Sequence, residues 1–237
     1  MRGALEPGLD VSDEERGFVE TFLNAQAERQ ESTRGSLGYN RNRIQDFRDS
    51  LVRAERLKDF VRSGAGFGDR NYTLDLAVQA PLAVQAIADG LSQVAYIELN
   101  DWDTHENNSL QSPKLQQLYT GLSALMDDLD GRGLLDQTMV AVISEMGRTP
   151  LVNGTGGKDH WPITSAMLLG AGIDGGKVFG GTDDGLNALA VDLHTGVTGP
   201  DGTQLQTANF LTGVLRSVGV DPSAYMDAEP FDAFCAS

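Results

Sequence analysis

The chain has 237 residues, and its 18 Lys and Arg against 34 Asp and Glu give a net charge of −16. With 40% apolar and 22% charged residues, the composition is that of a globular protein large enough to bury a core. The negative charge argues against nucleic acid and anionic membrane surfaces as partners, because both attract positively charged proteins. No apolar run of about 18 residues predicts a membrane-spanning helix, and the single cysteine, Cys235, excludes an internal disulfide.

The first part of the chain is polar and charged, with almost no Val or Ile over residues 12–62. A capping-box pattern at Ser12 and Glu15 predicts the start of a helix, and a second charged helix is predicted to follow. We therefore expect a helical N-terminal segment over residues 1–70, followed by one α/β domain over residues 71–237.

Short apolar runs alternate with helical patterns in the rest of the chain. Three runs predict buried strands, over residues 94–99, 138–144 and 164–170. Helical patterns are present over residues 71–90, where Pro81 is expected to kink or split the helix, and over 112–133 and 205–218. Strand, helix and strand in succession are typical of a mostly parallel sheet covered by helices on both faces.

Two loops that follow the first two predicted strands carry the candidate metal ligands. Asp103 and His105 lie in the first loop, and His160 lies in the second. Since ligands bind at the carboxyl ends of strands in open α/β sheets, we expect these side chains to meet at one edge. Three such ligands suit a divalent ion and leave one position for water. Arg148, also in the second loop, is predicted to hold an anionic oxygen.

The same residues also suit purely structural roles. Asp and Asn in loops often cap turns, and a lone loop histidine is more often hydrogen-bonded than bound to metal. Trp102 and Trp161 are interpreted as anchors that pack the loops on the core. His194 is interpreted as a residue without a functional role.

Three motifs in order carry a family resemblance: LNDWDTHENN, ISEMGRTPLVNGTGGKDHWP and GGKVFGGTD. They resemble the bacterial family named domain of unknown function 1501, from about Gln79 to the C-terminus and more weakly before it. That family is similar to the alkaline phosphatase and sulfatase superfamily. The resemblance implies an α/β sandwich around a mostly parallel sheet. It also implies hydrolysis of small anionic phosphate or sulfate esters with divalent ions, such as zinc, manganese or calcium, and a Ser, Thr or formylglycine nucleophile.

By the same resemblance, Asp103, His105 and His160 correspond to one metal site. Glu145 takes the place of an acidic ligand of a second site. Asp101 is an alternative to Asp103, because its spacing from His105 is the one seen in the phosphatases. Here the sequence departs from the superfamily, which usually has a histidine after the acidic residue of the second site. This chain has Met146, and methionine is a poor ligand for a hard cation.

The superfamily's first strand, which bears a further metal-ligating Asp and precedes the nucleophile, has no counterpart before Val94. Members of the family are usually longer and begin with a twin-arginine export signal. We therefore expect an incomplete sheet, in the C-terminal part of such a protein. The chain as written carries no export signal, which by itself predicts a cytoplasmic location.

Three functions follow as hypotheses from these patterns. The first is a metal-binding, hydrolase-like domain of unknown substrate. The second is a non-catalytic or truncated relative that keeps the fold. The third is a binding or assembly protein that uses the polar N-terminal helices as a docking surface.

Overall fold

The computed structural model describes residues 76–236 and a few isolated residues between 17 and 56. By its contacts the chain divides into two units, Met1–Asn71 with Asp89–Val94, and Tyr72–Ala88 with Ala95–Ser237. The predicted N-terminal helices, and the docking surface assigned to them, lie almost entirely outside the described residues. The elements below belong to the second unit.

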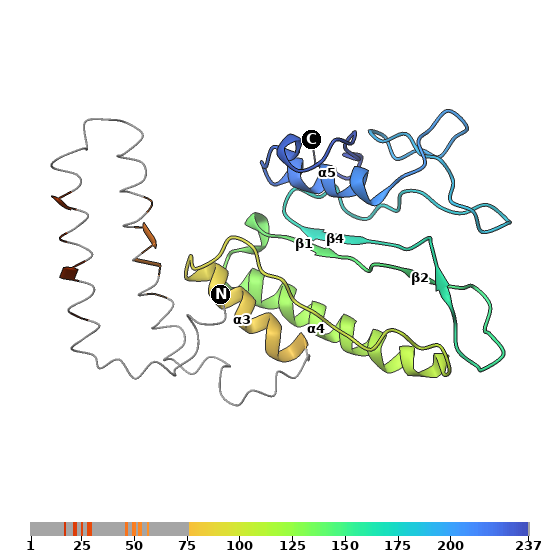
Figure 1. Ribbon diagram of the computed structural model, residues 1–237, viewed down its shortest axis with the longest axis horizontal. Coiled ribbons are helices and arrows are strands. Elements are labelled where there is room, and N and C mark those ends of the chain that lie inside the picture. The colour runs from red at the N-terminus through yellow and green to blue at the C-terminus, as the bar shows by residue number, and fades with distance from the viewer. Residues whose placement is uncertain are drawn as a thin grey trace. The chain divides into compact units, whose positions relative to one another are not determined.

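This unit combines helices with very short strands (Figure 1). Its elements are the α-helices α3 (Leu76–Ala88), α4 (Gln111–Gly131) and α5 (Thr207–Ser217), the strands β1 (Met139–Val142), β2 (Gly147–Arg148), β3 (His160–Trp161) and β4 (Met167–Gly170), and the 3-10 turns η2 (Asn108–Leu110), η3 (Leu135–Gln137) and η4 (Pro222–Ala224). The helices predicted over residues 112–133 and 205–218 are confirmed as α4 and α5. Pro81 lies inside α3 without splitting it.

Helices α3 and α4 pack on each other through small and aliphatic side chains. Ala80 and Val84, four residues apart on α3, form a buried cluster with Leu125 and Leu129 of α4. Residues three to four apart share one face of a helix, so this spacing turns both apolar faces inward. Val140 of β1 packs against the same cluster.

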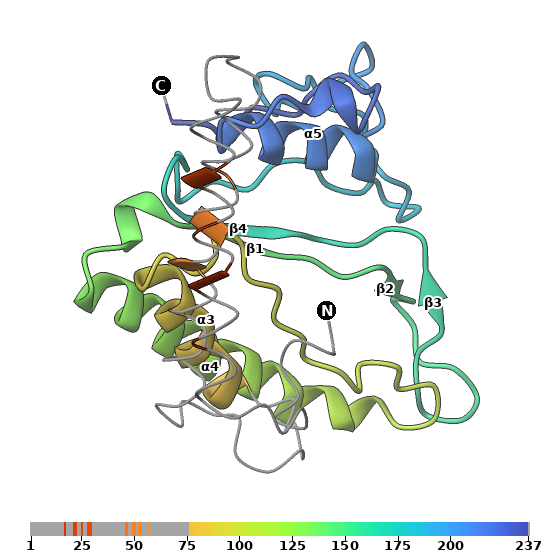
Figure 2. The same ribbon diagram turned by 60° about the vertical axis from the view of Figure 1, so that its left-hand side comes forward.

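A second buried cluster lies towards the C-terminus. It consists of Val191, Leu193, Phe231 and Phe234, and packs against Val214 of α5, Met139 of β1 and Leu168 of β4. The β1–β4 pair therefore contributes to both clusters and lies between the α3–α4 pair and the C-terminal elements (Figure 2).

The prediction of a mostly parallel sheet covered by helices is wrong. Among the described residues there are two sheets of two strands each, β1 with β4 and β2 with β3, and both pairs are antiparallel. The chain between β1 and β4 forms the β2–β3 hairpin and contains no helix. Parallel pairing needs a crossover, usually helical, that returns the chain to the same end of the sheet. Without that crossover, β4 runs back along β1.

The apolar run over residues 94–99 forms no strand. Tyr96 is 85% exposed. The backbone N–H of Glu98 donates to Oε1 of Gln79 at 3.1 Å, and its carbonyl accepts from Nε2 of Gln79 at 2.7 Å. A side-chain amide on α3 thus pairs with this backbone where a neighbouring strand was expected. None of the described helices is both long and apolar enough to cross a membrane.

Candidate metal centre

The loop before α4 presents Asp103 and His105 on the same side. Thr104, between them, is buried, and its hydroxyl accepts from Nε2 of Gln111 at 2.9 Å. The same Gln111 nitrogen donates to the carbonyl of Trp102 at 3.1 Å, which fastens the loop to the start of α4. Nε1 of Trp102 donates to the carbonyl of Leu99 at 2.8 Å, a bond within the same loop. The N–H of Thr104 also donates to the carbonyl of Trp102 at 3.0 Å, which closes a tight turn at Asp103. The loop is therefore held at Thr104, and the side chains of Asp103 and His105 on either side of it are exposed.

The β2–β3 hairpin brings a second loop onto the first. Arg148 and His160 are paired across the hairpin. The N–H of Lys158 donates to the carbonyl of Thr104 at 3.2 Å, and the N–H of Asn108 donates to the carbonyl of Gly156 at 3.0 Å. These backbone contacts hold the loop of residues 149–159 directly against the loop that carries Asp103 and His105.

Asp103, His105 and His160 come together where the two loops meet. Nε2 of His105 and Nε2 of His160 each lie 3.0 Å from the same oxygen, Oδ1 of Asp103. The two imidazole centroids are 4.9 Å apart, and one ligand atom from each of the three residues lies within 4.8 Å of the others. All three side chains are exposed, by 44% to 59%. Among the described residues, this is the one group of three potential metal ligands at such separations.

Arg148 ties the two loops together beneath this group. Its side chain is only 12% exposed. It donates to the Asp103 carboxylate, to the carbonyl of Trp102 at 2.9 Å and to the carbonyl of Lys158 at 3.1 Å. The hydrogen bond from Arg148, followed by that from His160, lowers the pKa of Asp103 to about 2. Asp103 is therefore an anion at neutral pH, the form that binds a cation. That Arg148 stabilises an anion in a substrate stays a prediction.

Two of the predicted ligands lie apart from this group. Asp101 pairs with Nζ of Lys114 at 3.0 Å, and its side chain is 81% exposed. Glu145 accepts from the hydroxyl of the neighbouring Ser144 at 3.4 Å. Neither belongs to the three-residue group. The structure thus assembles one set of potential ligands and does not bring Glu145 to it.

Two further residues of the second loop contact the group, and the sequence interpretation gave them no role. Oδ1 of Asp159 lies 3.1 Å from Nδ1 of His105, on the opposite side of the ring from Asp103. Nδ2 of Asn153 donates to the same Asp159 oxygen at 3.0 Å. The bond from Asn153 and then that from His105 hold the pKa of Asp159 below its usual value. The one sequence signal for Asp159 was its place directly before His160.

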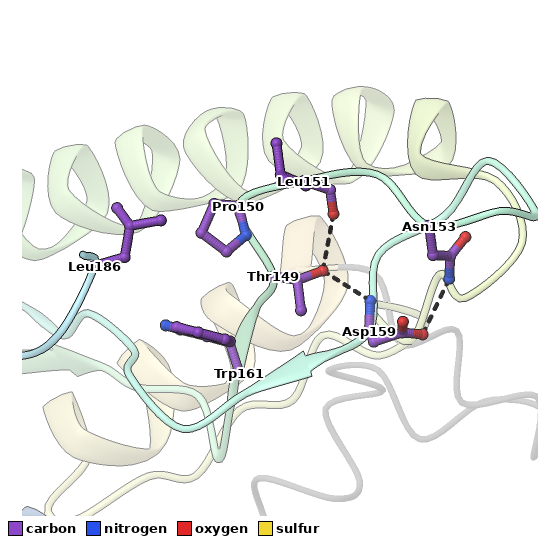
Figure 3. A pocket seen from close by; sticks show the side chains of 7 residues that line it. All are labelled: Thr149, Pro150, Leu151, Asn153, Asp159, Trp161 and Leu186. Carbon is purple, nitrogen blue, oxygen red and sulfur yellow. Dashed lines mark hydrogen bonds between the residues drawn. The ribbon is translucent and has the colours of Figure 1, made fainter. Parts of the chain in front are cut away.

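A pocket of 330 Å³ adjoins the group and shares Asn153 and Asp159 with its surroundings. Its lining residues are Thr149, Pro150, Leu151, Asn153, Asp159, Trp161 and Leu186. Figure 3 shows the ring of Trp161 beside Pro150 and Leu186, with Asp159 turned towards Asn153. Trp161 follows His160 in β3, so the two side chains leave opposite faces of the strand.

The chain belongs to the family described as protein of unknown function (DUF1501), which matches residues 1–228. No curated protein and no solved structure matches it.

Proposed function

We propose that this member of the DUF1501 family binds one divalent metal ion through Asp103, His105 and His160. The observation that carries the proposal is the convergence of two Nε2 atoms on one carboxylate oxygen, each at 3.0 Å, from two loops far apart in the sequence. Ligand atoms about 2.1 Å from a tetrahedral ion lie about 3.4 Å from one another. The two Nε2–Oδ1 separations of 3.0 Å are close to that value, and all three ligand atoms lie within 4.8 Å of one another.

The ligand set also favours a class of ion. Two imidazole nitrogens and one carboxylate oxygen are typical of zinc and related transition metals. Calcium prefers six to eight oxygen ligands, which this group does not offer. Of the three ions that the resemblance implies, zinc therefore fits these residues best.

A hydrolase-like activity on small anionic esters is the second step of the proposal. A bound ion supplies Lewis acidity towards a phosphate or sulfate oxygen. The exposure of His105 and His160 leaves room for a ligand above the group. Arg148, which donates to two carbonyls and to the Asp103 carboxylate, offsets the negative charge of Asp103 at the base of the group, and this reduces the repulsion of an anionic substrate.

One observation favours the alternative of a non-catalytic relative. Asp103 is hydrogen-bonded by Arg148 and His160, so direct side-chain contacts join the two loops. Glu145, the predicted ligand of a second ion, lies outside the three-residue group. In this alternative the protein keeps the polar cluster as a structural contact and hydrolyses no ester.

The first test is a zinc titration of the chelator-stripped protein, with competition by a chromophoric chelator. We expect one ion per chain, and an affinity lower by more than ~100-fold in His160→Ala, because even the loss of a ligand's hydrogen-bond partner costs 10- to 100-fold. His194→Ala is the matched control, since His194 bonds Asp232 and lies outside the group. Equal zinc affinity in His160→Ala and the wild type would show that the ligand assignment is wrong.

Hydrolysis is tested on the zinc-loaded protein with 4-nitrophenyl phosphate and 4-nitrophenyl sulfate. Release of nitrophenolate by the wild type and the His194→Ala control, but not by His160→Ala, supports the hydrolase. Tight zinc binding without turnover of either ester favours the non-catalytic alternative.

A further inference from the structure

The two ring nitrogens of His105 face two different carboxylates. Nε2 lies 3.0 Å from Asp103, inside the proposed metal site, and Nδ1 lies 3.1 Å from Asp159, outside it. An imidazole that binds a metal through one nitrogen carries its hydrogen on the other, and an acceptor there fixes both the tautomer and the ring orientation. Asp159 lies in the position of such an acceptor.

We infer that Asp159 is the positioning residue of this site, which orients His105 so that Nε2 and not Nδ1 binds the ion. The inference rests on the proposed metal-binding function and extends it to a residue that is not a ligand. In the loaded site, Nδ1–H of His105 donates to Oδ1 of Asp159, and the Nε2 lone pair points to the space shared with Asp103 and His160.

Contacts other than the His105 ring also fix the orientation of Asp159. Its N–H donates to Oγ1 of Thr149 at 3.1 Å, and its Oδ1 accepts from Nδ2 of Asn153 at 3.0 Å. Asn153 also donates to the carbonyl of His105 at 3.0 Å. Its own Oδ1 accepts from the N–H of Gly157 at 3.0 Å, which leaves the NH₂ group of Asn153 facing Asp159. The loop backbone thus sets the amide, and the amide sets the carboxylate.

His160 provides an internal contrast. Within the described part of the chain, its one carboxylate partner is Asp103, on Nε2. Asp159 bonds the His105 ring and not that of His160. The loss of Asp159 should therefore alter the binding mode of His105 and leave that of His160 unchanged.

The test compares Asp159→Ala and Asp159→Asn with the wild type. Asp232→Asn is the matched control, because Asp232 also bonds a histidine, His194, but lies away from the site. We expect zinc affinity to fall 10- to 100-fold in Asp159→Ala. Asp159→Asn keeps a neutral oxygen for the imidazole N–H, so its zinc affinity should lie between those of Asp159→Ala and the wild type. The control should bind zinc as the wild type does.

A spectroscopic readout separates positioning from a general loss of structure. The chain has three histidines, so in a His194→Gln background the long-range proton–nitrogen NMR spectrum contains two imidazoles. In the zinc-loaded protein, both should be metal-bound through Nε2. In Asp159→Ala at saturating zinc, the His105 signals should include an Nδ1-bound population, while those of His160 stay the same.

The outcomes distinguish this inference from the proposed function. If the wild type binds no zinc, both fail. If the wild type binds zinc and Asp159→Ala binds it equally well through the same nitrogens, the metal site stands and the role of Asp159 is refuted.

Discussion

Gly157 is the position where one added methyl group should disrupt the site without changing the side chain of a proposed ligand. A Cβ there would lie 2.0 Å from both the carbonyl carbon and the oxygen of His105, and 2.5 Å from the N of Glu106. Real Cβ atoms essentially never lie closer than 3.0 Å to such atoms, and ordinary contact begins at 3.4 Å, so these atoms must move apart by 1.0 to 1.4 Å (3.0 or 3.4 minus 2.0 Å). The opposing atoms are backbone and cannot rotate out of the way.

Such a separation is large compared with what a metal site tolerates. Metal–ligand distances vary by about 0.2 Å, and His160, the first residue of β3, lies three residues after Gly157. We therefore expect Gly157→Ala to lower zinc affinity by more than ~100-fold, comparable with the loss of a ligand. The overpacking should also cost about 1–3 kcal/mol in the free energy of unfolding.

The assay is the chelator competition described above, with circular dichroism to confirm that the variant is folded. Gly154→Ala is the control, because it lies in the same loop and a Cβ there meets no atom within 4 Å. It should bind zinc as the wild type does. If Gly157→Ala and Gly154→Ala bind zinc equally, loop contact does not set the geometry of the site, and the reasoning is refuted.

Two further predictions concern stability. In α4, a Cβ on Gly121 would lie 2.6 Å from both Cβ and Cδ2 of Leu76. Gly121→Ala should therefore lower the free energy of unfolding by about 1–3 kcal/mol through overpacking, and the urea midpoint should fall with it. Gly131→Ala is the control: a Cβ there meets no atom within 4 Å, so its midpoint should equal or exceed that of the wild type. Equal midpoints would contradict close α3–α4 packing. The hydrogen bond to Asp232 raises the pKa of His194 above 6.5. The stability from this raised pKa is fully present below about pH 6.5 and is lost as pH rises through the folded-state value. In urea unfolding from about pH 5.5 to 9, the wild type should lose its advantage over His194→Gln as pH rises. If the difference in the free energy of unfolding between the two proteins did not change with pH, the His194–Asp232 pair would not contribute to stability in this way.

Local sequence patterns predicted the positions of helices and strands correctly in most cases, but they did not predict which strands pair or in which direction. The periodicity of α4 and α5 is contained in each segment, and both helices lie where the sequence places them. The apolar runs marked β1 and β4 correctly, but an apolar run indicates which residues favour burial and not which strand lies beside them. The pairing of β1 and β4 is antiparallel because no helical crossover connects them. The backbone of Glu98, predicted to pair with a neighbouring strand, bonds instead to the side chain of Gln79, which lies 19 residues away in the chain.

The candidate site was predicted in part, and for an incorrect reason. Asp103, His105 and His160 were expected to meet at the carboxyl edge of a parallel sheet. They meet although the described residues contain no such sheet. Their proximity comes from contacts between loops, such as the bond from Lys158 to the carbonyl of Thr104. Asp159 could not be assigned from the sequence, because its partner is 54 residues away and depends on how the loops meet.

This origin explains why residues outside the ligand set should control the site. A site on a sheet edge inherits its geometry from the hydrogen-bonded strands beneath it. Here the proposed ligands are exposed, and the atoms that fix their separation belong to the loops themselves. These are the buried Gly157 against the His105 backbone, and Asn153 bonded to both His105 and Asp159. Gly157 allows the two loops to approach closely, and the side-chain amide of Asn153 bonds Asp159, which contacts the imidazole of His105. Ligand substitutions alone would show which atoms bind the ion, whereas substitutions at Gly157 and Asp159 test how the loops place those atoms.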